Sequence, residues 1–235
     1  MTRAGYSRHR ALTALAAVLA VTGLVQCAPA DAASRPVAAP GVAIVTHNGG
    51  DTRGCTVGYT ARDTAGDRLA VTAGHCADGV HQEVYLDNGV SIGTVIAWRP
   101  DQMSARDYGY TVIWLYDNVA QSPALDASTA LDHADIGHTG DLVCMFGAKS
   151  GRTCGAIEHA EPGVLTTYSN IAQHGDSGAP VMRVTDGALI GIVVGGNGGH
   201  TDGSETVIEP ISRINALVSA IPDLAGFGPI VANPR

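Results

Sequence analysis

Runs of β-branched and aromatic residues recur along most of the chain, and glycine-containing turns such as Asp78-Gly79 and Asn88-Gly89 separate several of them. Such runs are typical of β-strands, and Asp-Gly and Asn-Gly pairs are typical of the turns between strands. The chain between 117 and 136 has fewer strand-forming residues and is predicted to connect two β-rich halves, 41–120 and 121–225. The pattern therefore predicts an all-β fold. The predicted strands cover 55–62, 69–71, 90–98, 108–116, 142–146, 155–159, 164–168, 180–184, 188–194 and 205–209.

One stretch near the C-terminus has helical periodicity. Apolar residues stand at positions 211, 214, 217, 218 and 221, and spacings of three and four place them on one face of a helix. We therefore expect an amphipathic helix over 211–221 that packs on the second half of the chain.

The first 32 residues have the pattern of a secretory signal peptide. Three arginines precede an apolar run over 11–25, and small-x-small cleavage sites end at Ala30 and Ala32. The alternatives are a membrane anchor, for which the run is short, and a lipoprotein signal ending at Cys27, for which Gln26 is a poor preceding residue. We expect 1–32 to be removed, the protein to be secreted, and 33–40 to form a flexible mature N-terminus.

Composition and charge limit the classes of partner that the protein is expected to bind. Of the 235 residues, 45% are hydrophobic and 15% charged, which is typical of a globular chain. Removal of 1–32 takes three of the 14 basic and one of the 22 acidic residues and leaves a formal net charge of −10. A surface this acidic repels nucleic acid and anionic lipid, so we expect neither as a partner.

Four cysteines follow the predicted signal peptide, and an even number in an exported chain favours disulfides over free thiols. Of the three possible pairings, Cys55–Cys76 with Cys144–Cys154 keeps each bridge within one half of the chain. A zinc site is less favoured because the chain has neither a Cys-x-x-Cys pair nor a His-Glu-x-x-His motif. We expect no metal and no cofactor.

The segment Gly175-Asp176-Ser177-Gly178-Ala179-Pro180 has the composition of a nucleophile turn. Glycines on both sides of Ser177 allow a sharp turn that exposes the hydroxyl. They also leave the amides of Gly175 and Ser177 free to point together, and two such donors make an oxyanion hole.

A serine hydroxyl requires a base to accept its proton and a third group to orient that base. We predict that His75 is the base, because it directly follows the predicted strand 69–71 and Cys76 would fix its backbone. We predict that Asp107, at the start of an apolar strand, is the orienting carboxylate. Its rivals lie in more loop-like surroundings: Asp101, Asp117 and Asp132.

The order of these residues argues against one other serine-hydrolase fold, and the strand pattern argues against a second. The α/β-hydrolases have the order Ser, Asp, His and a Gly-x-Ser-x-Gly motif, whereas here histidine precedes serine and Ala179 replaces the second glycine. Subtilisins have the order Asp, His, Ser, which the chain permits, but their fold alternates strands with helices and this pattern does not.

Three motifs resemble the signatures of chymotrypsin-like serine peptidases: Thr72-Ala73-Gly74-His75-Cys76, Asp107-Tyr108 and Gly175-Asp176-Ser177-Gly178-Ala179-Pro180. The bacterial secreted branch with streptogrisins and α-lytic protease is the most similar. Cys144 with Gly151-Arg152-Thr153-Cys154-Gly155 resembles the second disulfide hairpin of that branch, and Gly191-Ile192-Val193-Val194-Gly195-Gly196 resembles its substrate-binding strand. The resemblance extends over 42–221.

The resemblance implies two six-stranded antiparallel β-barrels that form one peptidase domain, with the catalytic residues between them and a C-terminal α-helix. It implies the roles base for His75, orienter for Asp107 and nucleophile for Ser177. It also implies that Val194, Gly195 and Gly196 pair with an extended substrate. A monomer is the implied oligomeric state.

Several positions depart from the family pattern. A serine usually stands where Val194 does and helps to hold the catalytic aspartate. Tryptic members have an aspartate at the position of Ile171, so we expect an apolar primary pocket, with His174 at its rim. Because only about ten residues separate the predicted signal peptide from the barrels, we expect no large folding pro-region. Asp176 has no evident activating partner in the sequence, and Lys149 and Arg152 are candidates.

The sequence therefore predicts a secreted serine endopeptidase that acts on protein or peptide substrates through an acyl-enzyme on Ser177. The alternative is a non-catalytic relative that binds a peptide or protein in the same cleft.

Overall fold

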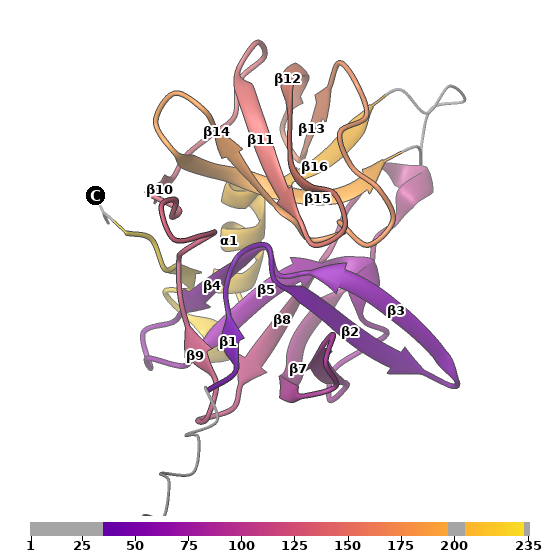
Figure 1. The fold of residues 1–235 in the computed structure, drawn as a ribbon, viewed down its shortest axis with the longest axis vertical. Coiled ribbons are helices and arrows are strands. Elements are labelled where there is room, and N and C mark those ends of the chain that lie inside the picture. The colour runs from indigo at the N-terminus through magenta and orange to yellow at the C-terminus, as the bar shows by residue number, and fades with distance from the viewer. Residues whose placement is uncertain (1–34, 197–204, 233–235) are drawn as a thin grey trace, which may run out of the picture. The chain divides into compact units, whose positions relative to one another are not determined.

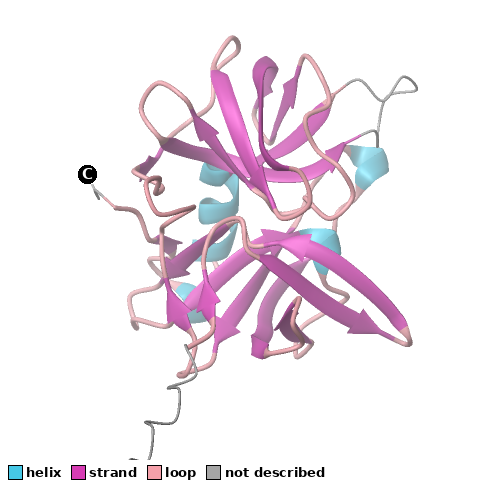
Figure 2. Ribbon diagram, in the orientation of Figure 1, coloured by secondary structure: helices cyan, strands magenta, loops and turns pink. Residues whose placement is uncertain are grey.

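The computed structural model describes residues 35–196 and 205–232. Strands dominate this part of the chain and form two β-barrel halves, one above the other in Figures 1 and 2, which confirms the predicted all-β class. The predicted signal peptide, 1–32, lies outside the described residues. Among those residues, no helix has the length and apolar character needed to cross a membrane.

The first barrel uses strands with the order β17-β4-β5-β8-β7-β6-β2-β3. The predicted run 55–62 is divided at Val57 and Gly58 into β3 and β4, so that one continuous segment pairs with β2 on one side and with β5 on the other. This segment joins the two edges of the sheet. The bounds are β2 (Ala43–Asn48), β3 (Asp51–Thr56), β4 (Tyr59–Arg62), β5 (Leu69–Ala73), β6 (Glu83–Leu86), β7 (Ser91–Arg99), β8 (Tyr110–Leu115) and β17 (Gly228–Pro229).

The second barrel contains six antiparallel strands in the order β15-β14-β11-β12-β13-β16, and pairing of β15 with β16 closes it. A two-residue strand, β10, adds to β15 in parallel from outside. The bounds are β10 (His133–Ala134), β11 (Leu142–Gly147), β12 (Gly151–Glu161), β13 (Val164–Thr167), β14 (Pro180–Arg183), β15 (Ala188–Gly196) and β16 (Thr206–Pro210). Every strand predicted in the second half is present, with shifted ends.

The segment just after the predicted signal peptide is ordered, and the prediction of a flexible 33–40 is wrong for its second part. Strand β1 (Val37–Ala38) pairs in parallel with β9 (Ala120–Gln121). Ala38 is fully buried and Ala39 is 8% exposed. Small side chains explain the outcome, because they fit against the first barrel where a larger residue would not.

Each barrel has its own apolar core, and the helix α1 (Ile211–Ser219) packs between them. Ile211, Ile214 and Val218 are buried in a cluster that extends through the first barrel and includes Ile192 of β15. The predicted helix is thus confirmed, but it contacts both halves of the chain (Figure 1). Short 3-10 helices cover Gly74–Cys76, Met103–Ala105 and Pro222–Leu224.

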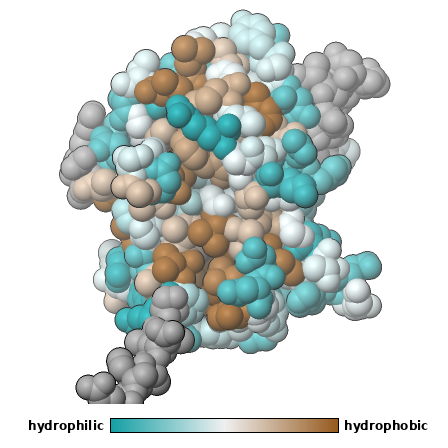
Figure 3. All heavy atoms as spheres, in the orientation of Figure 1, coloured by the Kyte–Doolittle hydropathy of each residue, from teal (hydrophilic) through white to brown (hydrophobic). Residues whose placement is uncertain are grey.

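Close backbone contact joins the two barrels at Gly58. A Cβ atom at this position would lie 2.6 Å from the carbonyl oxygen of Gly178 and 2.6 Å from Ile192 Cγ2, so only glycine fits. This contact places the loop before β14 against the junction of β3 and β4. On the face drawn in Figure 3, exposed apolar side chains are interspersed with polar ones.

Candidate active site

His75 lies where β5 ends, in the 3-10 turn Gly74–Cys76. The Cys55–Cys76 disulfide joins this turn to β3, and the Cys144–Cys154 disulfide joins β11 to β12, so both predicted pairings are confirmed. The disulfide fixes the backbone next to His75. The imidazole itself remains 37% exposed.

The carboxylate that contacts His75 is Asp101. The Nδ1 atom of His75 lies 2.5 Å from Asp101 Oδ2, and the Asp101 side chain is only 3% exposed. The other oxygen, Oδ1, accepts a 2.6 Å hydrogen bond from the Gly109 amide. Asp101 is therefore held on both oxygens, one by the backbone and one by the imidazole.

The prediction that Asp107 orients His75 is wrong in this structure. Asp107 Oδ2 lies 2.5 Å from the guanidinium of Arg99, and Oδ1 forms an ion pair with Arg213. Partial burial acts to raise the pKa of Asp107, but the Arg213 hydrogen bond and the Arg99 charge lower it. The aspartate at the start of the strand thus binds two cations on the outside of the loop.

A small closed loop explains this exchange of aspartates. Gln102 and Asp107 form a backbone bridge, so the intervening residues fold back on themselves and bring Asp101 next to Gly109. Glycine is required on both sides of the carboxylate. A Cβ at Gly74 would lie 2.6 Å from Asp101 Oδ1, and a Cβ at Gly109 would lie 1.9 Å from the Arg99 carbonyl oxygen.

Sequence reasoning missed a buried acid behind this loop. Glu209, at the end of β16, is fully buried and forms an ion pair with Arg213 of α1. Burial raises the pKa of Glu209 to about 8 even though Arg213 lies against it. Arg213 also donates a 2.8 Å hydrogen bond to the Tyr108 carbonyl and so connects α1 to the 101–109 loop. The i, i+4 spacing of Glu209 and Arg213 was the available signal.

Ser177 lies in a tight turn before β14, against the strands that carry His75. Its carbonyl oxygen accepts a 2.8 Å hydrogen bond from the Thr56 amide and lies 3.8 Å from the Cys76 sulfur. The next residue, Gly178, packs so closely that a Cβ would lie 2.1 Å from Thr72 Oγ1. No hydrogen bond joins the Ser177 hydroxyl to His75 among the described residues, and such bonds are often long before substrate binds.

The turn has the backbone conformation that the flanking glycines predicted. Gly175 and Gly178 have φ values of 101° and 89°, which other residues rarely adopt. Within 35–196 and 205–232, neither the Gly175 nor the Ser177 amide donates a hydrogen bond to the protein. Both amides are therefore available to an oxyanion.

Backbone amides hold the buried Asp176 carboxylate. Oδ1 accepts from the amides of Lys149 and Ser150, and Oδ2 accepts from the amide of Gln173, at 2.9–3.0 Å. Of the two predicted partners, Lys149 contacts Asp176 through its backbone amide. Gly147 makes room for this contact, since a Cβ there would lie 2.1 Å from Asp176 Oδ1.

The predicted pocket residues occupy different environments. Ile171 is half-buried against the apolar core of the second barrel. Its amide donates a hydrogen bond to Thr206 Oγ1, and its carbonyl accepts one from the Thr153 hydroxyl. Val194 is 1% exposed in the apolar cluster of the first barrel, and its side chain has no polar atom that could contact Asp101. His174 is exposed.

One edge of β15 is available to an added strand. β14 pairs with β15 only as far as Ile192, and Val193 then exchanges hydrogen bonds with Gly178 and Ala179. The register shifts at Val194, and beyond it Gly195 and Gly196 pair with β16 on the other side alone among the described strands. Main-chain groups at such an edge can bind an extended peptide.

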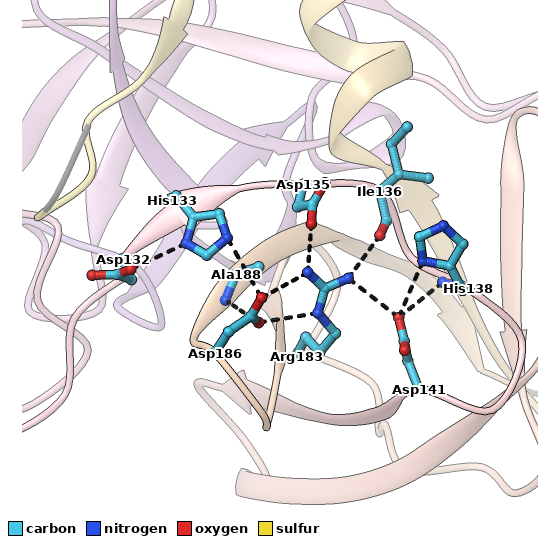
Figure 4. A network of polar contacts seen from close by, with 9 residues as sticks. All are labelled: Asp132, His133, Asp135, Ile136, His138, Asp141, Arg183, Asp186 and Ala188. Carbon is cyan, nitrogen blue, oxygen red and sulfur yellow. Dashed lines mark hydrogen bonds and ion pairs between the residues drawn. The ribbon is translucent and has the colours of Figure 1, made fainter. Parts of the chain in front are cut away.

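Among the described residues, two groups of side chains have metal-ligand chemistry, but members of both already bind other protein groups. Cys55 and Cys76, near His75, are joined in the disulfide and offer no thiolate. In the second group, His133, Asp135 and Asp186, the two carboxylates bind the guanidinium of Arg183, which lies 2.5 Å from Asp135 and 2.8 Å from Asp186 (Figure 4). His133 lies 3.6 Å from Asp186.

Comparison with solved structures identifies the fold as that of chymotrypsin-like serine proteases. Nocardiopsis protease is 20% identical with a TM-score of 0.62, and the alignment covers 77% of this chain and 96% of that one. Thermobifida fusca protease A is 22% identical with a TM-score of 0.62, and the alignment covers 77% and 95%. An α-lytic protease homologue is 23% identical with a TM-score of 0.58, and the alignment covers 77% and 96%. The predicted two-barrel fold is confirmed.

Sequence comparison places the chain in a family with two uncharacterized proteins of Mycobacterium tuberculosis, from the strains CDC 1551 and H37Rv. Each is 34% identical over 199 residues, which cover 78% of this chain and 82% of the mycobacterial protein. The chain belongs to the same family as these proteins. No family model matches it.

Proposed function

We propose that this protein is a serine endopeptidase that hydrolyses peptide bonds through an acyl-enzyme on Ser177. The observation that carries the proposal is the 2.5 Å contact between His75 Nδ1 and the Asp101 carboxylate. His75 lies on the turn that ends at Cys76, and the Cys76 sulfur lies 3.8 Å from the Ser177 carbonyl oxygen. A buried carboxylate on Nδ1 keeps a proton there and leaves Nε2 free to act as a base.

The proposed reaction has two halves. His75 Nε2 takes the Ser177 hydroxyl proton as Oγ attacks the carbonyl carbon, and the Gly175 and Ser177 amides stabilise the resulting oxyanion. His75 then donates the proton to the leaving amine, which yields an ester on Ser177. Water hydrolyses that ester by the same steps, again with His75 as base.

The free edge of β15 supports a protein or peptide substrate. An extended chain that pairs with Val194, Gly195 and Gly196 would bring its scissile carbonyl toward Ser177. Ile171, at the position where tryptic relatives have aspartate, supports a pocket for a medium or large apolar side chain. The exposed His174 lies three residues before Ser177. An imidazole at the rim of the pocket would favour a substrate with an acidic side chain, which is the alternative to the apolar preference.

Export is part of the proposal. The basic head, apolar run and small-residue cleavage sites of 1–32 support secretion, and two disulfides agree with an oxidising compartment.

Hydrolysis of a peptide library by the purified mature protein tests this proposal. We expect cleavage after apolar residues by the wild type and none by Ser177→Ala. Dominant cleavage after Lys or Arg would contradict the assignment of Ile171, and cleavage after Glu or Asp would assign specificity to His174. Saturable peptide binding without any cleavage would instead favour a non-catalytic binding protein. The buried Val194, which stands where the family usually has a supporting serine, also favours this alternative.

A further inference from the structure

Thr56 joins the first barrel to the loop that carries Ser177. It ends β3, next to Cys55, and is fully buried. Its amide donates to the Ser177 carbonyl, and its carbonyl accepts from the Thr72 hydroxyl, each at 2.8 Å. The backbone of Thr56 thus connects the serine turn to the strand that leads to His75.

The Thr56 hydroxyl makes two further contacts with the second barrel. It donates a 2.8 Å hydrogen bond to the Gly175 carbonyl and accepts a 3.1 Å hydrogen bond from the Ala148 amide. The following amides, of Lys149 and Ser150, hold the Asp176 carboxylate. One hydroxyl and one carboxylate therefore attach the β11–β12 turn to the segment before Ser177.

The contact with Gly175 bears directly on the oxyanion donors. Gly175 has a φ of 101° and no side chain, so few steric contacts limit rotation of its neighbouring peptide groups. The Gly175 carbonyl belongs to the peptide group that follows Gly175, and the Gly175 amide belongs to the one that precedes it. Fixing the carbonyl limits rotation about the Gly175 ψ angle, and this limits how far the preceding amide can turn relative to the second barrel. We propose that Thr56 is a positioning residue for the oxyanion hole, because its hydroxyl orients the peptide groups around Gly175. This inference rests on the proposed peptidase function.

Loss of the hydroxyl would leave this segment free to rearrange. Gly175 is half-buried and Ala148 is exposed, so both groups can turn toward water when the hydroxyl is removed. Such a turn satisfies the two groups but changes the ψ angle of Gly175, and through it the direction of the Gly175 amide relative to the oxyanion. The expected damage is therefore to catalysis rather than to peptide binding.

Three variants test the proposal. Thr56→Val keeps the shape and removes both hydrogen bonds, whereas Thr56→Ser keeps the hydroxyl. Thr60→Val is the matched control, because Thr60 is also fully buried in the first barrel and donates to a carbonyl, that of Ser122, at 3.1 Å. The readouts are kcat, KM and the affinity for a peptide aldehyde, whose hemiacetal oxygen occupies the oxyanion hole.

We expect Thr56→Val to lower kcat and aldehyde affinity about ten- to hundred-fold with KM within about twofold, because one oxyanion donor contributes about 10²–10³ in kcat. Thr56→Ser should restore both to within about threefold of the wild type, and Thr60→Val should leave both within about twofold. Unchanged kcat and aldehyde affinity in Thr56→Val would overturn the proposal. Equal losses in Thr56→Val and Thr60→Val would overturn it as well, since they would indicate a general structural effect.

Amide NMR separates this proposal from the proposed function. If the wild type neither cleaves peptides nor binds the aldehyde, the peptidase proposal has failed, but the amide resonances of Gly175 and Ser177 still report on Thr56. Movement of these resonances in Thr56→Val and not in Thr60→Val would support the positioning role. Unmoved resonances would reject it.

Discussion

Replacing Asp101 by asparagine is expected to leave His75 in the wrong tautomer. The Gly109 amide donates to Asp101 Oδ1 at 2.6 Å, so in Asp101→Asn this site retains the carbonyl oxygen of the new amide. In the wild type, Asp101 Oδ2 lies 2.5 Å from His75 Nδ1. In the variant, the amide nitrogen takes the place of Oδ2 and faces Nδ1. Because that nitrogen donates, Nδ1 must accept, and the ring proton moves to Nε2.

The loss follows from this reversal. A histidine that carries its proton on Nε2 cannot take the proton of Ser177, and the equivalent change in a serine-protease triad lowers kcat about 10⁴-fold. That factor corresponds to about 5.4 kcal/mol in activation free energy. The Asp101 side chain is 3% exposed, so solvent offers little screening to moderate the effect.

Hydrolysis of a fluorogenic peptide at saturation measures the effect, with near-ultraviolet circular dichroism to verify folding. Asp107→Asn is the matched control, because it makes the same chemical change in the same loop at the carboxylate paired with Arg99 and Arg213. We expect Asp107→Asn to lower kcat less than about tenfold, since it touches no reacting group. A smaller loss in Asp101→Asn than in Asp107→Asn would refute the assignment.

Three further predictions concern stability. Burial raises the pKa of Glu209 in the folded protein to about 8, whereas its pKa in the unfolded chain is about 4.3. The contribution of protonated Glu209 to folding stability is therefore fully present below about pH 4.3 and is lost as the pH rises from there through 8. Glu209→Gln should therefore gain stability over the wild type from pH 5 to pH 9, by up to about 1.4 kcal/mol per pH unit over that interval, and a constant difference in thermal melting would reject this. Gly109→Ala should cost more than about 3 kcal/mol in urea unfolding because its Cβ would meet the Arg99 carbonyl at 1.9 Å, and a cost below about 1 kcal/mol would disprove the close contact. Replacing Cys55 and Cys76 together by serine should cost about 3 kcal/mol, and an unchanged urea midpoint would show that the bridge does not stabilise the fold.

Most of the strand pattern could be predicted because runs of β-branched and aromatic residues and glycine-containing turns are local features. The division of the run 55–62 at Gly58 could not, since it depends on the Gly178 carbonyl and Ile192 of the other barrel. The ordered β1 was missed for a similar reason. Its partner, β9, lies about eighty residues away and consists of only two residues.

Within the candidate site, the proposed nucleophile and base could be selected from their flanking residues, whereas the residues that contact and support them could not. Asp107 has the better local context, and only the closed loop 102–107 brings Asp101 to His75. The partners of Asp176 are backbone amides, which carry no sequence signal. Thr56 is likewise one of several buried threonines, and only its hydrogen bond to the Gly175 carbonyl, in the turn before Ser177, distinguishes it from the others.

Intact-mass analysis after treatment with a fluorophosphonate tests whether Ser177 is an activated nucleophile. We predict a single adduct on the wild-type mature protein, mapped by peptide analysis to Ser177, with none on Ser177→Ala and greatly slowed labelling of His75→Ala. A folded wild type that forms no adduct, or a Ser177→Ala variant that labels equally, would contradict it.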